Sequence, residues 1–157
     1  MTGTPIEGGM TAPDFTLPRD GGGQITLSAL RPQAVVLYFY PKDDTSGCTR
    51  EAVDFTAMAE EFAAAGAAVI GVSKDSVESH DRFVEKHGLG VILASDAQGD
   101  VAERYGVWGE KSMYGRTYMG IDRTTFLIDG AGMVREVWRK VKVAGHAAEV
   151  LAAVRAL

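Results

Sequence analysis

The sequence predicts an α/β domain, in which a central mixed β-sheet is flanked by helices and preceded by a β-hairpin. Three observations support this fold class. Residues 34–40 (AVVLYFY) and 67–72 (AAVIGV) are continuous apolar runs rich in β-branched and aromatic residues, as in strands buried on both faces. Between them, apolar residues recur at helical spacing. A strong hairpin signal, DGAG at residues 129–132, comes late in the chain.

The chain has 157 residues, which we interpret as one domain covering residues 1–157. Residues 1–11 are rich in Gly and Thr and are expected to form a flexible N-terminus. Residues 14–17 and 24–27 alternate between apolar and polar side chains on either side of a Gly-rich loop. This pattern predicts the N-terminal β-hairpin.

Helices and strands then alternate. Apolar residues at positions 52, 55, 58, 59 and 62 predict a helix over 48–65, with Gly66 just beyond its end. A second helix is expected over 76–87, because Ser76 can cap its start and Gly88 can stop it. The next expected elements are a short strand over 91–94 and a short helix over 100–105.

The last part of the chain is expected to contain antiparallel strands. Residues 108–120 have no clean period and contain three glycines, so we interpret them as a long loop. Strands over 124–128 and 134–137 flank the hairpin turn, and a helix over 147–157 closes the chain. Parallel strands joined by helices, followed by an antiparallel pair and a helix, match the thioredoxin fold, with helices expected on both faces of the sheet.

Composition excludes several classes of function. The formal net charge is −5, and the basic residues are scattered apart from a modest group at 135–142, which we interpret as a solvated strand edge. Nucleic acid is therefore not an expected partner. No apolar run reaches the ~20 residues of a membrane span, and the N-terminus does not have the pattern of a signal peptide. A single cysteine cannot form an internal disulfide, so the cytoplasm is the expected compartment.

Cys48 is that single cysteine, and its setting favours a reactive thiol over a packed one. It follows Pro41 and a polar turn, and its neighbours are Thr45, Ser46, Gly47, Thr49, Arg50 and Glu51. A thiolate is the nucleophilic form of cysteine, and a helix N-terminus stabilises an anion. Sites in open α/β sheets lie at the carboxyl ends of strands, and Cys48 directly follows the 34–40 strand.

A nearby cation would also stabilise a thiolate, and Arg123 is the best candidate. It stands at the start of the 124–128 strand, which in this fold lies close to the 34–40 strand. From composition alone, a surface arginine at a strand end is the better interpretation. His80, His87 and His146 lie in or beside predicted helices, far from Cys48 along the chain, and are expected at the surface. No Cys/His cluster has metal-ligand spacing, so neither a metal nor a cofactor is expected.

The segment around Cys48 resembles the active site of the peroxiredoxins. Pro41, Thr45 and Cys48 reproduce that family's Pro-x-x-x-Thr-x-x-Cys pattern, and the branch it looks closest to is the bacterioferritin comigratory protein / peroxiredoxin Q group. The resemblance spans essentially the whole domain. Supporting matches are residues 12–17 (APDFTL), 106–111 (GVWGEK), 120–129 (GIDRTTFLID) and 137–141 (VWRKV).

The resemblance implies a thiol-dependent peroxidase that reduces hydrogen peroxide and organic hydroperoxides. Cys48 would attack the peroxide and become a sulfenic acid. Thr45 would hydrogen-bond the peroxide, and it could also be a plain N-cap of the helix. Arg123 would stabilise the thiolate and the leaving oxygen. Pro41 would shield the thiolate from water, and Glu51 would orient Arg123, although a first-turn glutamate that complements the helix dipole is about equally expected.

The chain departs from the resemblance at one position. Many members of this branch have a resolving cysteine five residues after the first, where this chain has Val53, on what we expect to be the core face of the helix. The resemblance is thus to a 1-Cys variant, natural or engineered. Its sulfenic acid would be reduced by an external thiol, namely thioredoxin, glutaredoxin or a small thiol. We expect a monomer or a weak homodimer.

Three alternatives to a peroxidase stay open at this stage. A peroxide sensor would use the same sulfenic acid chemistry without turnover. A thiol-disulfide oxidoreductase would need Cys-x-x-Cys, whereas Thr45 holds the position three residues before Cys48. A non-catalytic interaction module with the thioredoxin fold predicts slow alkylation of Cys48.

Overall fold

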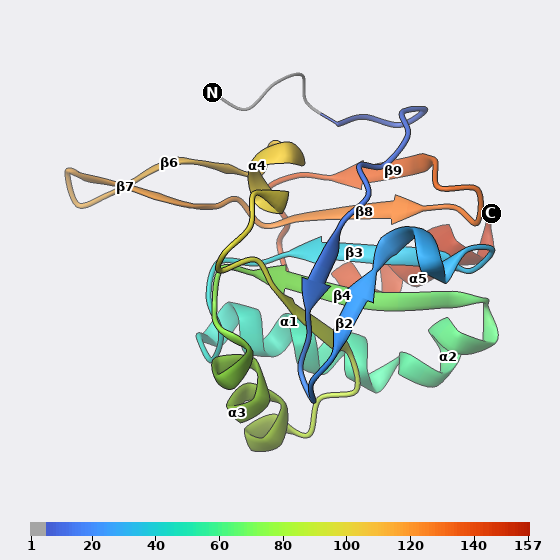
Figure 1. Cartoon of the computed structure of the whole chain (residues 1–157), viewed down its shortest axis with the longest axis horizontal. Helices are drawn as coiled ribbons and strands as arrows, with labels where there is room; N and C mark the ends of the chain where they lie inside the picture. Colours follow the sequence, from blue (N-terminus) through green and yellow to red (C-terminus); the bar gives the residue numbers. More distant parts are fainter. Residues whose placement is uncertain (1–5) are drawn as a thin grey trace.

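The computed structural model describes residues 6–157 and has a five-stranded mixed sheet at its centre (Figure 1). The strand order is β5-β4-β3-β8-β9. The bounds are Ala34–Phe39 for β3, Ala67–Ser73 for β4, Ile92–Ser95 for β5, Thr124–Ile128 for β8 and Val134–Trp138 for β9. β3, β4 and β5 are parallel, whereas β8 and β9 run antiparallel to their neighbours. This arrangement confirms the predicted α/β fold of the thioredoxin type.

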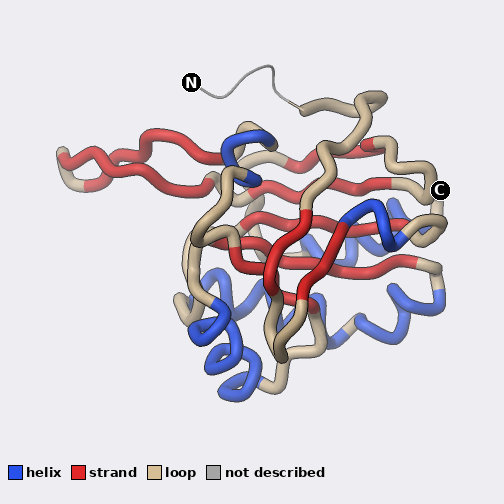
Figure 2. The backbone as a smooth tube through the Cα atoms, viewed as in Figure 1, coloured by secondary structure: helices blue, strands red, loops and turns tan. Residues whose placement is uncertain are grey.

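The two faces of the sheet are covered differently (Figure 2). One face packs against four helices: α1 (Ser46–Ala57), α2 (Ala59–Ala64), α3 (Val77–His87) and α5 (His146–Arg155). The other face packs against the N-terminal hairpin and two short helices: β1 (Thr16–Pro18), β2 (Gln24–Thr26), η1 (Leu27–Leu30) and α4 (Val101–Arg104). Helices therefore reach both faces, as predicted, but the hairpin supplies much of the second cover.

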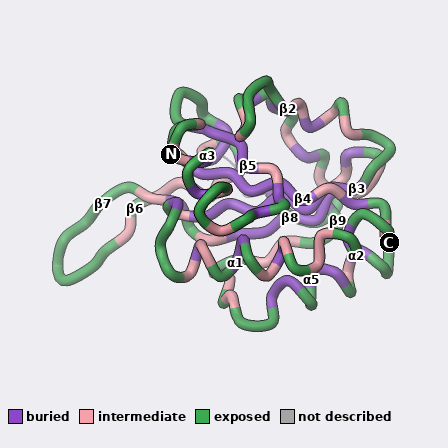
Figure 3. Tube along the Cα trace, turned by 90° about the horizontal axis from the view of Figure 1, so that it is seen from below, coloured by how far each residue is buried: buried purple, intermediate pink, exposed green. Residues whose placement is uncertain are grey.

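Strand β3 explains why there are two cores. All six of its residues are buried, and side chains of a strand point alternately to opposite faces. Val35, Leu37 and Phe39 belong to the core on the hairpin side, whereas Val36 and Tyr38 belong to the core on the helix side. Figure 3 shows the buried residues concentrated in these central strands. The continuous apolar run in the sequence is the direct result of this two-sided burial.

The start of the described chain lies along strand β9. The Gly9 amide donates to the Val134 carbonyl at 2.8 Å, and Thr11 forms an isolated antiparallel bridge with Met133. The flexibility expected for residues 1–11 stays a prediction, and residues 1–5 lie outside the described residues.

The single helix predicted over 48–65 is wrong, because the structure has two helices that meet at Met58. Met58 has φ −105° and ψ 10°, outside helical values. Two residues earlier, the Thr56 hydroxyl donates to the Ala52 carbonyl at 2.7 Å and accepts the Gly90 amide. A threonine that bonds back to the carbonyl four residues earlier bends a helix, which accounts for a break at this place.

The long loop predicted over 108–120 is also wrong. These residues form a two-stranded ribbon of β6 (Trp108–Met113) and β7 (Arg116–Ile121), which projects from the domain as an arm (Figure 1). Its two-residue turn is Tyr114-Gly115, and both residues have positive φ, as a type I′ hairpin turn requires. Because most of the arm is exposed on both faces, it lacks the alternation of apolar residues that identifies a half-buried strand.

One pairing in the sheet sets the position of the functional site. Strand β3 ends at Phe39, and its antiparallel partner on β8 is Thr124, the first residue of that strand. The segment that leaves β3 and the residue that precedes β8 therefore meet at the same edge of the sheet. Cys48 lies on that segment's helix, and Arg123 is the residue just before β8.

Candidate active site

Cys48 lies in the first turn of α1, and its side chain is almost completely buried, at 1% exposure. The residue before the helix is Thr45, whose extended backbone (φ −99°, ψ 157°) is typical of an N-cap. Its side chain makes no cap hydrogen bond. The helix thus begins two residues before Cys48, which places the thiol where the unpaired N–H groups of a helix start gather.

Arg123 joins Cys48 to Glu51. Its Nη2 donates to the Cys48 Sγ at 3.4 Å, and its Nη1 donates to the Glu51 Oε1 at 2.7 Å. An added Cβ on Gly47 would lie 3.1 Å from Nη2, so the glycine before Cys48 leaves room for the guanidinium. One planar cation is therefore held between the thiol and a carboxylate, as the fixed fork of arginine donors allows.

Glu51 is a buried carboxyl group, 2% exposed, in the second turn of α1. Burial raises its pKa to about 7, and the charge and hydrogen bond of Arg123 only partly oppose that rise. Its Oε2 is buried and has no hydrogen-bond partner among residues 6–157. Glu51 and Cys48 in turn affect Arg123. Burial alone would lower the pKa of Arg123, but the negative charges of Glu51 and Cys48 raise that pKa. Arg123 is thus a permanent cation beside the thiol.

Thr45 and Pro41 flank the thiol in sequence on the loop that joins β3 to α1. The Thr45 hydroxyl donates to the Lys42 carbonyl at 2.8 Å, so its hydrogen is already used inside the loop. The side chain is otherwise exposed, and the lone pairs of the hydroxyl remain as acceptors. Pro41 is half-buried and directly follows the buried Tyr40.

Two of the three histidines contradict the prediction of surface positions. His80 on α3 and His146 at the start of α5 are both buried. His87, at the end of α3, is half-buried and so partly reaches the surface. His80 contacts Asp43, which lies on the loop before Cys48, at 2.7 Å. The sequence held one signal of this burial: His80 is three residues before Phe83, on the same apolar face of α3.

The core-face position predicted for Val53 is wrong as well. Its side chain is 41% exposed. The buried residues of α1 are Cys48, Glu51, Ala52 and Phe55. One step along an α-helix turns the side chain by about 100°, so Val53 points away from the direction of Ala52.

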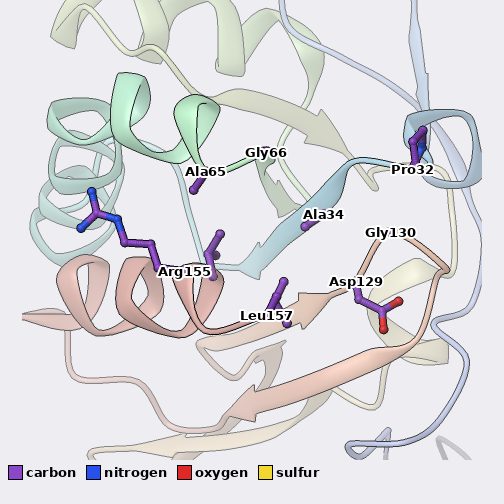
Figure 4. Close-up of a pocket in the computed structure, with 9 residues that line it drawn as sticks. Pro32, Ala34, Ala65, Gly66, Asp129, Gly130, Arg155 and Leu157 are labelled. Atoms are coloured by element: carbon purple, nitrogen blue, oxygen red, sulfur yellow. The ribbon is translucent and has the colours of Figure 1, made fainter.

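One cavity of the described chain lies away from Cys48, Arg123 and Glu51. A cavity of about 490 Å³ opens at the other end of β3, where Ala34, Gly66, Asp129 and Arg155 line it (Figure 4). None of the predicted site residues lines it. Within residues 6–157, no three His, Cys, Asp or Glu side chains gather as metal ligands. The helices of the same residues are all too short or too polar to cross a membrane.

Comparison with known proteins decides the family. Residues 9–137 match the model of the AhpC/TSA family. The chain belongs to the AhpC/TSA family. A putative peroxiredoxin bcp of Coxiella burnetii is 51% identical over 146 residues, which cover 93% of this chain and 97% of the relative. Peroxiredoxin Bcp of Bacillus subtilis is 50% identical and covers 93% of both chains. The chain is accordingly a peroxiredoxin, a thiol-dependent peroxidase.

Solved structures agree with this assignment. The Xanthomonas campestris bacterioferritin comigratory protein, studied for its alkyl peroxide reduction activity, superposes with a TM-score of 0.86 at 49% identity over 90% of both chains. A cysteine mutant of Xylella fastidiosa PrxQ gives a TM-score of 0.92 at 40% identity over 98% of both chains. Peroxiredoxin Q of Xanthomonas campestris, about 50% identical to this chain, has been solved as two different cysteine-to-serine mutants. It therefore has at least two cysteines, whereas this chain has one.

Proposed function

We propose that this peroxiredoxin reduces hydrogen peroxide and organic hydroperoxides at Cys48, with Arg123, Thr45 and Pro41 completing the site and Glu51 orienting Arg123. The observation that carries the proposal is the placement of the Cys48 Sγ 3.4 Å from the Arg123 Nη2, at the start of α1. A helix start and a permanent guanidinium both favour the thiolate, which is the form that attacks.

The chemical step is a displacement at oxygen. The Cys48 thiolate attacks the terminal oxygen of the hydroperoxide, so that an S–O bond forms while the O–O bond breaks. The sulfur loses two electrons and becomes a sulfenic acid, and the leaving oxygen takes up a proton to give water or an alcohol. Arg123 has five N–H groups, and two of them already contact Cys48 and Glu51. Its other donors can stabilise the negative charge that develops on the leaving oxygen.

Thr45 acts on the substrate as an acceptor. Because its hydroxyl hydrogen is donated to the Lys42 carbonyl, its oxygen offers lone pairs to a peroxide and accepts the peroxide O–H. That bond would orient the terminal oxygen toward the sulfur. Pro41 has no N–H and no polar side chain, and from its half-buried position it would limit access of water to the thiolate.

The cycle ends on another molecule, because the chain has no second cysteine. An external thiol would condense with the sulfenic acid to a mixed disulfide with loss of water, and a second thiol would release Cys48. Thioredoxin, glutaredoxin or a small thiol could fill this role. We place the reaction in the cytoplasm, where such thiols are kept reduced, and on a monomer or weak homodimer.

A comparison of the wild type with Cys48→Ser tests the proposal. With about one equivalent of hydrogen peroxide, the wild type should lose one thiol per chain and yield a sulfenic acid that a dimedone probe traps. Cys48→Ser should do neither. Repeated turnover with a thioredoxin, glutaredoxin or small-thiol system then separates a peroxidase from a sensor. Thiol loss no faster than that of free cysteine would contradict the proposal.

A further inference from the structure

The loop that joins β3 to α1 is fastened to α3 by a buried ion pair. Asp43, 7% exposed, accepts three hydrogen bonds on its carboxylate: from the Tyr40 hydroxyl at 2.6 Å, the Ser79 hydroxyl at 2.8 Å and the His80 Nδ1 at 2.7 Å. His80 is fully buried. Its other ring nitrogen, Nε2, lies 3.0 Å from the Ala94 carbonyl on β5.

These contacts determine the charge of His80. A neutral imidazole has one N–H and one lone pair, but both nitrogens of this ring face an acceptor that cannot donate: a carboxylate and a carbonyl. Only the imidazolium satisfies both. The groups that face the ring are Asp43 and Tyr40 from the loop, Asp75 from the turn before α3, and the Ala94 carbonyl. Burial alone would lower the pKa of His80, but the bond and charge of Asp43 outweigh it and raise the pKa.

The loop depends on these side-chain contacts. The Asp43 amide donates to the Asp75 Oδ2 at 2.9 Å, so the loop also contacts the turn that precedes α3. The next residue, Asp44, has φ +56°, a conformation that is strained for a residue with a side chain. Asp44 pairs with Lys86 and His87 of α3, but these partners are exposed or half-exposed, and such pairs contribute little.

We propose that His80 is a positioning residue for the peroxidase reaction, and that its imidazolium, through Asp43, holds the loop bearing Pro41 and Thr45 in place beside Cys48. This inference rests on the proposed function, because Cys48, Thr45 and Pro41 are its reacting site. His80 touches neither sulfur nor peroxide. Its effect on the rate would come from keeping the loop groups in position, since a misplacement of about 1 Å around a reacting atom can cost up to about 100-fold in rate.

The variant that tests this is His80→Asn, which keeps an N–H toward Asp43 but removes the charge and the second donor. We expect its second-order rate constant with peroxide to fall about tenfold or more. His87→Asn is the matched control, since it removes a histidine that pairs with an aspartate of the same loop at a more exposed position. It should stay within about twofold of the wild type.

Three readouts separate positioning from general destabilisation. The rate ratio of wild type to His80→Asn should be largest at low pH and should fall toward one as the pH passes through the pKa of His80, because the wild type then loses the same charge. Amide hydrogen exchange should accelerate over residues 41–49 in His80→Asn but not elsewhere. Nitrogen NMR of the wild type should find both His80 ring nitrogens protonated at pH 7.

The NMR and the exchange measurements use no peroxide, so they test the contact between His80 and the loop even if Cys48 proves unreactive. Should His80→Asn fail to fold, exchange of residues 41–49 in the wild type is followed through the pKa of His80 instead. Above that pH it should speed up by more than the base-catalysed increase shown by amides elsewhere in the protein. A neutral His80 ring at pH 7, a pH-independent rate ratio, or unchanged loop exchange would each overturn the inference.

Discussion

Replacement of Glu51 by glutamine should remove a loss of stability that the protein undergoes as the pH rises from acidic to neutral. Glutamine keeps an oxygen that can accept the Arg123 N–H. It removes a carboxylate that is 2% exposed and has one oxygen without a partner in the described part of the chain. Burial raises the pKa of Glu51 from its ordinary value of 4.5 to about 7. The native state thus binds the Glu51 proton more tightly than the unfolded chain does.

The sign and size of the effect follow from proton linkage. Because the native pKa is the higher one, the free energy of unfolding falls as the pH rises from about 4.5 to about 7, and the loss persists above that range. The rise of the pKa spans about 2.5 pH units, and at about 1.36 kcal/mol per unit the full loss is about 3 kcal/mol. Glu51→Gln should lack this loss.

Urea unfolding at several pH values measures the difference directly. Both proteins should carry Cys48→Ser, so that the neighbouring thiol does not titrate. The difference in unfolding free energy between Glu51→Gln and its parent should grow in favour of the variant by about 2–3 kcal/mol between pH 5 and pH 8. A difference that stays constant over this range would refute the reasoning, since it would mean that Glu51 titrates alike in both states.

Three further changes test the site and the core. Arg123→Gln should slow peroxide-dependent thiol loss by about 10²–10³-fold in stopped-flow experiments, as the loss of a preplaced donor does; a folded variant with a near-normal rate would argue against the role of Arg123. Val53→Cys should give less sulfinic acid, by mass spectrometry after peroxide pulses with limiting reductant, because a second thiol can intercept the sulfenic acid; equal yields would contradict this. Gly71→Ala places a Cβ 2.6 Å from the Tyr38 Cζ and should lower the free energy of unfolding by about 1–3 kcal/mol, measured by thermal unfolding; an unchanged stability would contradict this.

The sheet could be predicted from the sequence because its central strands are buried on both sides. An unbroken apolar run such as residues 34–40 is typical of a strand with no solvent-facing side, and it placed the expected end of β3 within one residue. The arm of β6 and β7 escaped prediction for the opposite reason. It is held by its ladder and by the Tyr114-Gly115 turn, and Tyr114 is 98% exposed, so burial left no pattern to recognise.

The residues of the site likewise differ in how well the sequence predicts them. Cys48, Thr45 and Pro41 are close in sequence, and Arg123 could be placed through the expected pairing of its strand. The contact between Asp43 and His80 spans 37 residues and depends on how α3 packs against the loop, which no local pattern encodes. The exposure of Val53 depends on how α1 is rotated about its axis. Ala52, the residue before it, is buried, so the local sequence does not show which of the two faces the core.

The contact between Arg123 and Cys48 joins residues 75 positions apart, and it forms only when β8 pairs with β3. A chain that is still being synthesised therefore contains its thiol long before it contains the guanidinium beside it. Until the sheet is complete, Cys48 lacks the contact with Arg123. If Arg123 activates Cys48 as we propose, the thiol therefore gains its activating cation only in the folded domain and not in the unfinished chain.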